Sequence, residues 1–125
     1  DVSSAFDPTY ASSFDKKNVA YLGHGMVFNK FTGSRGKSGS NDANAEYLAF
    51  IRKVMDDAEV SFQTAELGKV DLGGGGTIAY ILSLYGMNVI DCGVAVLNMH
   101  APFEATSKAD LYEAKRGYVA FLLAK

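Results

Sequence analysis

The sequence predicts an α/β fold, specifically a three-layer α/β/α sandwich around a mostly parallel mixed sheet. Extended and helical segments alternate along the chain, which is the pattern of a parallel sheet with helices on both faces. Residues 89–97 form an apolar, two-sided run, as expected for a central strand of such a sheet. The length of 125 residues and the apolar content of 48% are those of one globular domain.

The composition excludes several classes of protein. A net charge of −2 without a cluster of Lys and Arg argues against a nucleic-acid surface. No stretch approaches the ~18 consecutive apolar residues of a membrane span. Cys92, the single cysteine, cannot form an internal disulfide, which favours a cytoplasmic protein over a secreted scaffold. The chain begins with Asp rather than Met and without a signal peptide, so we interpret it as part of a longer protein.

The first elements expected are a loop, a strand and a helix. Residues 1–13 are dense in Ser, Thr and Asp, and their acidic members Asp1 and Asp7 are most simply turn caps. Residues 25–32 alternate and favour a strand. Residues 42–57 carry one apolar stripe at helical spacing, preceded by a flexible loop that ends in a cap at Ser40 or Asn41.

The loop before this helix resembles part of a phosphate-binding loop. Its Gly36-Lys37-Ser38 would complete a P-loop only if glycine stood at position 31. Phe31 occupies that position, which argues against nucleotide binding.

A strand over residues 60–67 leads to four consecutive glycines, residues 73–76, before Thr77 opens a helix that Gly86 ends. Four glycines suit a place where another molecule approaches the backbone closely, with amide groups of the helix start directed at it. A plain flexible connector is the alternative, and the residues alone leave both open.

The expected central strand, residues 88–97, runs to His100. A residue just beyond a strand end is held by the sheet and faces the cleft where α/β proteins bind ligands. His100 is therefore the first candidate for a metal ligand, with a hydrogen-bonded structural histidine as the alternative. A last helix follows, capped by Thr106 or Ser107, with Asp110 as a weak capping box.

Four blocks of sequence carry a resemblance to a known family. They are DVSSAFDPTY, GSRGKSGSNDANAEY, ELGKVDLGGGGTIAYIL and MNVIDCGVAVLNMHAPFE. In this order they resemble the zinc aminopeptidases related to aspartyl aminopeptidase and vacuolar aminopeptidase I. The resemblance implies that residues 1–125 are the C-terminal segment of a metallopeptidase catalytic domain, whose upstream half and dimerisation domain lie elsewhere.

The resemblance also implies a two-metal active site with two zinc ions, or Co or Mn in their place. Asp1 and His100 match two of the family's ligands and serve different metals. Two metals activate a bridging water and polarise the scissile carbonyl, and carboxylate and imidazole are suitable zinc donors. The other ligands and the catalytic glutamate belong to upstream motifs without a counterpart here, so we assign no catalytic residue and expect this chain alone to be inactive.

The glycine-rich segment matches a family segment beside the substrate. The residues that the resemblance assigns to peptide binding there are Gly74, Gly75, Gly76 and Thr77. They are the expected substrate-binding wall of the site.

Departures from the family pattern predict specificity. The aspartyl-preferring branch has histidines at the places of Ser4 and Asp7 and a lysine near Asn29, the remaining expected substrate-binding position. The lack of a cation at these three positions predicts a preference for neutral or hydrophobic N-terminal residues. A one-residue shift of the alignment would bring in Lys30, which leaves the acidic alternative open.

The expected partners are peptide substrates, the remainder of the catalytic chain and further copies, since shells of twelve subunits are usual in the family. The competing interpretations are a non-catalytic α/β domain and a nucleotide-binding domain that uses the Gly-rich loops. Metal at Asp1 and His100 would separate the peptidase from both.

Overall fold

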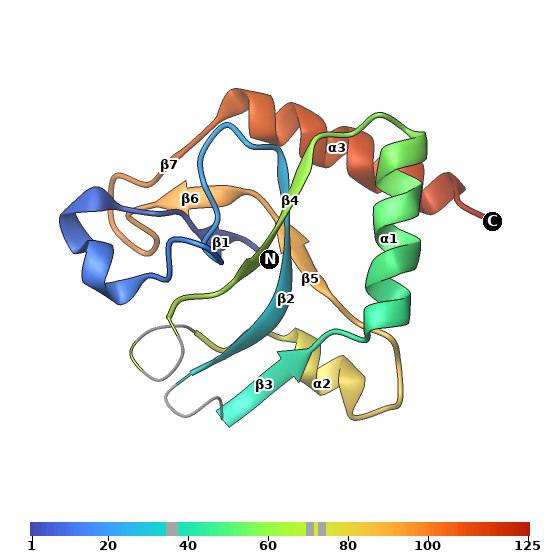
Figure 1. Ribbon diagram of the computed structural model, residues 1–125, viewed down its shortest axis with the longest axis horizontal. Coiled ribbons are helices and arrows are strands. Elements are labelled where there is room, and N and C mark those ends of the chain that lie inside the picture. Colours follow the sequence, from blue (N-terminus) through green and yellow to red (C-terminus); the bar gives the residue numbers. More distant parts are fainter. Residues whose placement is uncertain (35–37, 70–71, 73–74) are drawn as a thin grey trace.

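The computed structural model describes residues 1–34, 38–69, 72 and 75–125, and its architecture is mixed α/β with mixed sheets (Figure 1). The predicted fold class is thus confirmed. Its elements in chain order are β1 (Ser3–Ser4), the 3-10 helix η1 (Pro8–Ser13), β2 (Met26–Ser34), β3 (Ser38–Asp42), α1 (Ala45–Asp57), β4 (Phe62–Glu66), α2 (Ala79–Ser83), β5 (Asp91–Gly93), β6 (Ala95–Leu97), β7 (Ala105–Thr106) and α3 (Lys108–Leu123).

The central strand is β2, not the predicted strand at residues 88–97. One edge of β2 pairs with β4 in parallel. The opposite edge pairs antiparallel with β5 along its first half and with β3 along its second half. Both edges of β2 are therefore hydrogen-bonded, which makes it an interior strand.

The predicted strand at residues 88–97 divides at Val94 between two sheets. β5 joins β2, whereas β6 pairs in parallel with β1 and antiparallel with β7. Gly93 lies at the division, and a Cβ there would stand 1.9 Å from the carbonyl oxygen of Asp1. Because residue 93 has no side chain, the backbone at Asp1 can cross the end of β5. Hydrophobic periodicity does not predict such a crossing.

Two apolar layers cover the two faces of β2, because its side chains alternate between them. Met26 and Phe28 face α1 and α3, in a core with Ile51 and Met55. Figure 1 shows these two helices side by side against the sheet. The buried apolar side chains of the other face, against which the half-buried Leu22 and Leu97 pack, are small: Ala5, Ala20, Val27, Ala65 and Ala95.

Three other predictions are corrected locally. Residues 38–42 form β3 rather than a loop, and the cap of α1 is Asn44, whose Oδ1 accepts the N–H of Glu46 at 2.8 Å. α2 has five residues rather than the predicted ten of residues 77–86, and Ile78 at its N-cap makes no side-chain cap bond. Residues 1–13 contain β1 and η1 within the predicted loop.

Two predicted caps are confirmed. Asp7 Oδ1 accepts hydrogen bonds from the N–H and the hydroxyl of Thr9, and these bonds lower the pKa of the Asp7 carboxyl. Ser107 caps α3 through a bond from the N–H of Asp110. Among the described residues, no helix has both the length and the apolarity needed to cross a bilayer.

Asp110 does not close a capping box; its carboxylate instead holds a distant turn. It is buried and accepts the N–H groups of Gly23 and Gly25 at 2.8 Å each. Asp110→Asn would replace one of the two accepting oxygens by an amide donor, which leaves one of these N–H groups without an acceptor. We expect this to cost about 2 kcal/mol of local stability, which corresponds to a roughly 30-fold faster exchange of the amide. Hydrogen–deuterium exchange at Gly23 and Gly25 checks this, with the exposed Asp56→Asn as control. Unchanged exchange in Asp110→Asn would contradict it.

Candidate functional site

A cleft of about 460 Å³ gathers side chains from five separate stretches of the chain. Two of these stretches follow β4 and β6, at the carboxyl ends of the strands. The lining residues are Asp1, Val2, Ser4, Ser13, Phe14, Leu67, Gly68, Gly75, Gly76, Thr77, Met99 and His100. The cleft thus contains both residues predicted as metal ligands and three of those predicted to bind substrate.

Asp1 is held at the cleft by its backbone. Its nitrogen donates to the carbonyl oxygen of Cys92 at 3.0 Å, and its Oδ1 accepts the N–H of Val2 at 2.9 Å. Oδ2 has no hydrogen-bond partner among the described residues. The carboxylate therefore keeps an oxygen for a ligand.

His100 stands in a turn between β6 and β7. It has a φ of 69° and Asn98 a φ of 56°, left-handed values that cost free energy unless neighbours hold them. The neighbour is Glu104, whose Oε1 accepts the N–H of His100 at 2.5 Å. The exposed imidazole makes no hydrogen bond to the described part of the chain. The structural-histidine alternative thus lacks a partner there.

The third wall of the cleft is the backbone of residues 75–77. The N–H groups of Gly75, Gly76 and Thr77 have no partner among the described residues. The Gly75 carbonyl oxygen is fixed by the N–H of Gly33 at 3.0 Å. A Cβ on Gly76 would meet no described atom within 4 Å, so crowding within the chain does not explain this glycine. Gly74, like Gly36 and Lys37 of the P-loop alternative, lies outside the described residues.

Asn29 is the predicted site residue that the structure does not bring into the cleft. It is 0% exposed on β2, and its Oδ1 accepts the hydroxyl of Ser3 at 2.9 Å. Its Nδ2 has no partner in the described part of the chain. Asn29 therefore lies in the sheet interior, and a direct contact with substrate gains no support from this position.

The charge of the cleft is set by Asp1, because no Lys or Arg is among its described lining residues. Lys30, the nearest cation in the sequence to Asn29, forms an ion pair with Asp42. Asp7 is outside the lining, whereas Ser4 is part of it. Apolar side chains of Val2, Phe14, Leu67 and Met99 complete the walls.

Among the described residues, the cleft offers two side chains that commonly bind zinc, Asp1 and His100. Within the described ranges, no group of three or more His, Cys, Asp and Glu side chains is placed to hold an ion. Zinc usually takes at least three protein ligands. Asp1 and His100 can therefore contribute to a metal centre only together with ligands from outside the described residues.

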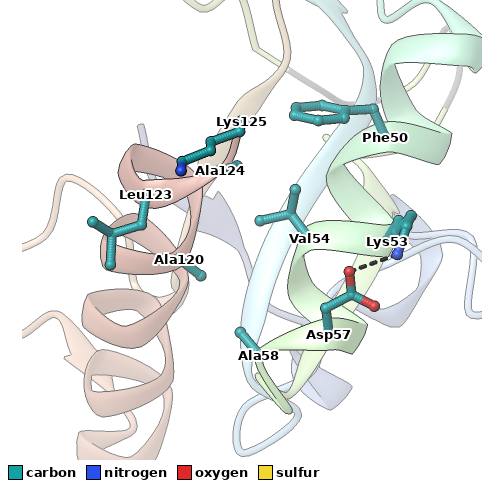
Figure 2. Close-up of a pocket in the computed structure, with 9 residues that line it drawn as sticks. All are labelled: Phe50, Lys53, Val54, Asp57, Ala58, Ala120, Leu123, Ala124 and Lys125. Atoms are coloured by element: carbon teal, nitrogen blue, oxygen red, sulfur yellow. Dashed lines mark hydrogen bonds and ion pairs between the residues drawn. The ribbon is translucent and has the colours of Figure 1, made fainter.

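A second groove, of about 510 Å³, lies between α1 and α3. Figure 2 shows Phe50 and Val54 of α1 opposite Ala120 and Leu123 of α3. Its polar groups are Lys125 and the ion pair of Lys53 with Asp57 at 2.6 Å. This groove lacks the convergent donors of the cleft at Asp1, so we place the site in the cleft.

Two residues that support the cleft, Glu104 and Asp91, were not predicted from the sequence. Glu104 holds the turn at His100, and Asp91 accepts a hydrogen bond from the hydroxyl of Thr77 at 2.8 Å. A signal for Asp91 was present, because a lone carboxylate within an apolar strand must find a partner when buried. Glu104 had no such signal.

Glu104→Ala should loosen the turn that carries His100. We expect the amide of His100 to exchange about tenfold faster, since an exposed charged hydrogen bond contributes about 1.4 kcal/mol. Site-resolved hydrogen–deuterium exchange measures this. Glu46→Ala, which removes an exposed glutamate of α1, should leave the His100 amide unchanged. Equal protection in Glu104→Ala and the unsubstituted protein would show that Glu104 does not hold the turn.

Comparison with known proteins gives a family match over nearly the whole chain. Residues 1–122 match the family model described as aminopeptidase I zinc metalloprotease (M18). A probable M18 family aminopeptidase 1 of Clostridium acetobutylicum is 69% identical over 122 residues, which cover 98% of this chain and 26% of the relative. The corresponding protein of Thermotoga maritima is 50% identical over 121 residues, covering 97% of this chain and 26% of the relative.

Solved structures agree with this match. The crystal structure of aminopeptidase I from Clostridium acetobutylicum superposes with a TM-score of 0.92 at 68% identity, over 99% of this chain and 27% of that one. The chain spans about a quarter of the length of the curated relatives it matches.

Proposed function

Because the chain belongs to the aminopeptidase I family of zinc metalloproteases (M18), we propose that it forms part of the active site of an aminopeptidase that releases N-terminal amino acids from peptides. In this proposal residues 1–125 are the C-terminal segment of the catalytic domain. The upstream half and a dimerisation domain belong to the remainder of the protein. The coverage of about a quarter of each relative supports a larger enzyme.

The observation that carries the proposal is the meeting of Asp1 and His100 in one cleft. Asp1 precedes β1 and His100 lies in the turn between β6 and β7, yet both line the cleft beside Gly75, Gly76 and Thr77. An α/β domain without a metal site has no need to bring together a carboxylate oxygen and an imidazole that both lack a partner among the described residues.

The donor set fits the zinc that the family description names. A carboxylate and a neutral imidazole are both common zinc ligands, and each keeps a donor atom without a described partner. Asp1 and His100 would each serve one of two ions, with further ligands from the remainder of the protein. When bound, the metal pair lowers the pKa of a water and polarises the peptide carbonyl. Cobalt or manganese would supply the same chemistry.

The residues of this chain also bind the peptide. The N–H groups of residues 75–77, which have no partner among the described residues, are donors for a substrate carbonyl oxygen, and the missing side chain of Gly76 leaves room for close approach. The predicted role of Gly74 extends this wall beyond the described residues. Glu104 holds the turn of His100, so we expect the proton-transferring glutamate to come from the remainder of the protein.

The cleft favours neutral or hydrophobic N-terminal side chains in this proposal. Its described walls carry no Lys or Arg, and Lys30, which follows Asn29 in the sequence, is outside the lining and forms an ion pair with Asp42. Ser4 lines the cleft where the aspartyl-preferring branch would have a histidine. An acidic side chain would lose its hydration there without gaining a positive partner.

We further propose that the whole enzyme is a cytoplasmic homo-oligomer, with a dodecameric shell as the expected assembly. Large apolar side chains are exposed just after α2, at Leu84 and Tyr85, and on α3, at Leu122. They need cover from the remainder of the chain or from further copies. The nucleotide-binding alternative has no comparable support, since the family match places the Gly-rich segments in a peptidase.

The chain offers a matched test of the metal site, because it contains two histidines. In the intact enzyme, His100→Ala should remove about one zinc ion per subunit and lower kcat/KM at least 100-fold, since a ligand of the metal pair is lost. His24→Ala is the control: His24 is exposed, and its Nδ1 lies 3.1 Å from the carbonyl oxygen of Leu22, outside the cleft. Zinc content by mass spectrometry and aminoacyl-anilide hydrolysis are the measurements. Equal zinc content and activity in both variants would exclude His100 as a ligand.

The specificity proposal has its own test. Leucyl and methionyl anilides should be hydrolysed with a kcat/KM at least tenfold above that of aspartyl and glutamyl anilides, because the described cleft has no cation for an acidic side chain. Adding a cation at the cleft, in Ser4→Lys, should narrow this ratio, and Ser61→Lys at an exposed position is the control. A faster reaction with acidic substrates in the unsubstituted enzyme would overturn the proposed preference.

A further inference from the structure

A buried polar row runs beneath the cleft, made up of Ser3, Asn29, Asp91 and Thr77. Each of these side chains is at most 7% exposed. Asn29 and Asp91 are directly opposite one another in the β2–β5 pairing, so their side chains share a face of the sheet. The row therefore joins the segment that begins at Asp1 to the wall formed by residues 75–77.

The strongest contact in the row fixes Thr77. Its hydroxyl donates to Asp91 Oδ2 at 2.8 Å, and a hydrogen bond to a carboxylate is charge-assisted. Thr32, fully buried on β2, has its hydroxyl oxygen 3.3 Å from that of Thr77 and so closes the cluster from the sheet. The side chain of Thr77 consequently points into the sheet, although the residue lines the cleft.

A second tie holds the same wall by its backbone. The N–H of Gly33 donates to the carbonyl oxygen of Gly75 at 3.0 Å. Gly75 and Gly76 have no side chains of their own to anchor, and α2 behind them has only five residues. The anchors of the wall among the described residues are therefore this backbone bond and the hydrogen bonds of the Thr77 hydroxyl with Asp91 and Thr32.

The carboxylate of Asp91 is expensive to bury. No cation from the described ranges contacts it, and its hydrogen bonds come from hydroxyl groups. An apolar side chain would fill the same interior position without a desolvation cost. The carboxylate at position 91 accepts the hydrogen bond of Thr77, which an apolar side chain could not do.

We propose that Asp91 is a positioning residue for peptide binding, which acts through the Thr77 hydroxyl to hold the N–H groups of residues 75–77 toward the cleft. This rests on the proposed aminopeptidase function. Asp91 itself is not among the lining residues of the cleft, so we expect it to act without contacting the substrate. Its burial costs free energy, but it restrains the wall formed by residues 75–77, which would otherwise be flexible because two of the three residues are glycines.

The first readout is independent of activity. In the intact enzyme, the amide of Gly33, which donates to the carbonyl oxygen of Gly75 at 3.0 Å, should exchange at least tenfold faster in Asp91→Ala and in Thr77→Val than in the unsubstituted protein. Thr77→Ser, which keeps the hydroxyl, should recover most of the protection lost in Thr77→Val. Asp56→Ala and Thr64→Val, the same changes at exposed positions, are the controls. Unchanged exchange in Thr77→Val would overturn the proposal, even if Asp91→Ala fails to fold.

The second readout is kinetic. Asp91→Ala and Thr77→Val should each lower kcat/KM for an aminoacyl anilide about 10- to 100-fold, mainly through KM, with zinc content unchanged. The double variant should be no worse than either single variant, because the two residues act as one unit. Losses that multiply in the double variant, or faster exchange with unaltered kinetics, would overturn the positioning role.

The two proposals fail in distinguishable ways. If the intact, zinc-loaded enzyme hydrolyses no aminoacyl substrate, the proposed function fails, and the exchange readout alone decides whether Asp91 orders the wall. If hydrolysis occurs and depends on His100 but not on Asp91 or Thr77, the function stands and the positioning role is wrong.

Discussion

The structure depends on one interior strand, β2, which pairs with other strands along both edges and is packed on both faces. β4 takes one edge, β5 and β3 share the other, and apolar layers cover both faces. An interior strand cannot leave polar groups to water, so Asn29 and Thr32 must find partners inside the protein. Those partners, Ser3 on one side and Thr77 with Asp91 on the other, lie under the cleft. The sheet and the site are thus connected through the polar residues of its central strand.

The sequence predicted the elements that local periodicity encodes well. The apolar patterns predicted β2, α1 and α3, and the structure contains these elements close to the expected positions. Their alternation predicted the α/β class. The sequence did not predict which strand is central, since residues 89–97 are the more apolar run while β2 carries Asn29, Lys30 and Thr32. Centrality is set by long-range pairing, and the division at Val94 depends on a backbone crossing that no local pattern records.

The site was predictable in a different way from the fold. Nothing in the spacing of Asp1 and His100 indicates that they share a cleft, and only the four ordered sequence blocks suggested it. The alignment that gave these two residues also gave Asn29, which the structure buries beneath the cleft rather than on its wall. Glu104 and Asp91 were missed because their importance lies in what they hold, His100 and Thr77, and a sequence does not display hydrogen-bond partners.

The crossing of Asp1 over Gly93 has a consequence for how this stretch of sequence can change over evolutionary time. With only 1.9 Å between a Cβ at position 93 and the carbonyl oxygen of Asp1, even alanine would force two segments apart. The half-buried Cys92 and the buried Val94 can exchange for side chains of similar volume with modest loss. Gly93 has no comparable replacement, because every other amino acid adds a Cβ atom at this position. A substitution of Gly93 would displace Asp1. We therefore expect Gly93 to be retained wherever Asp1 must keep its position relative to the turn of His100.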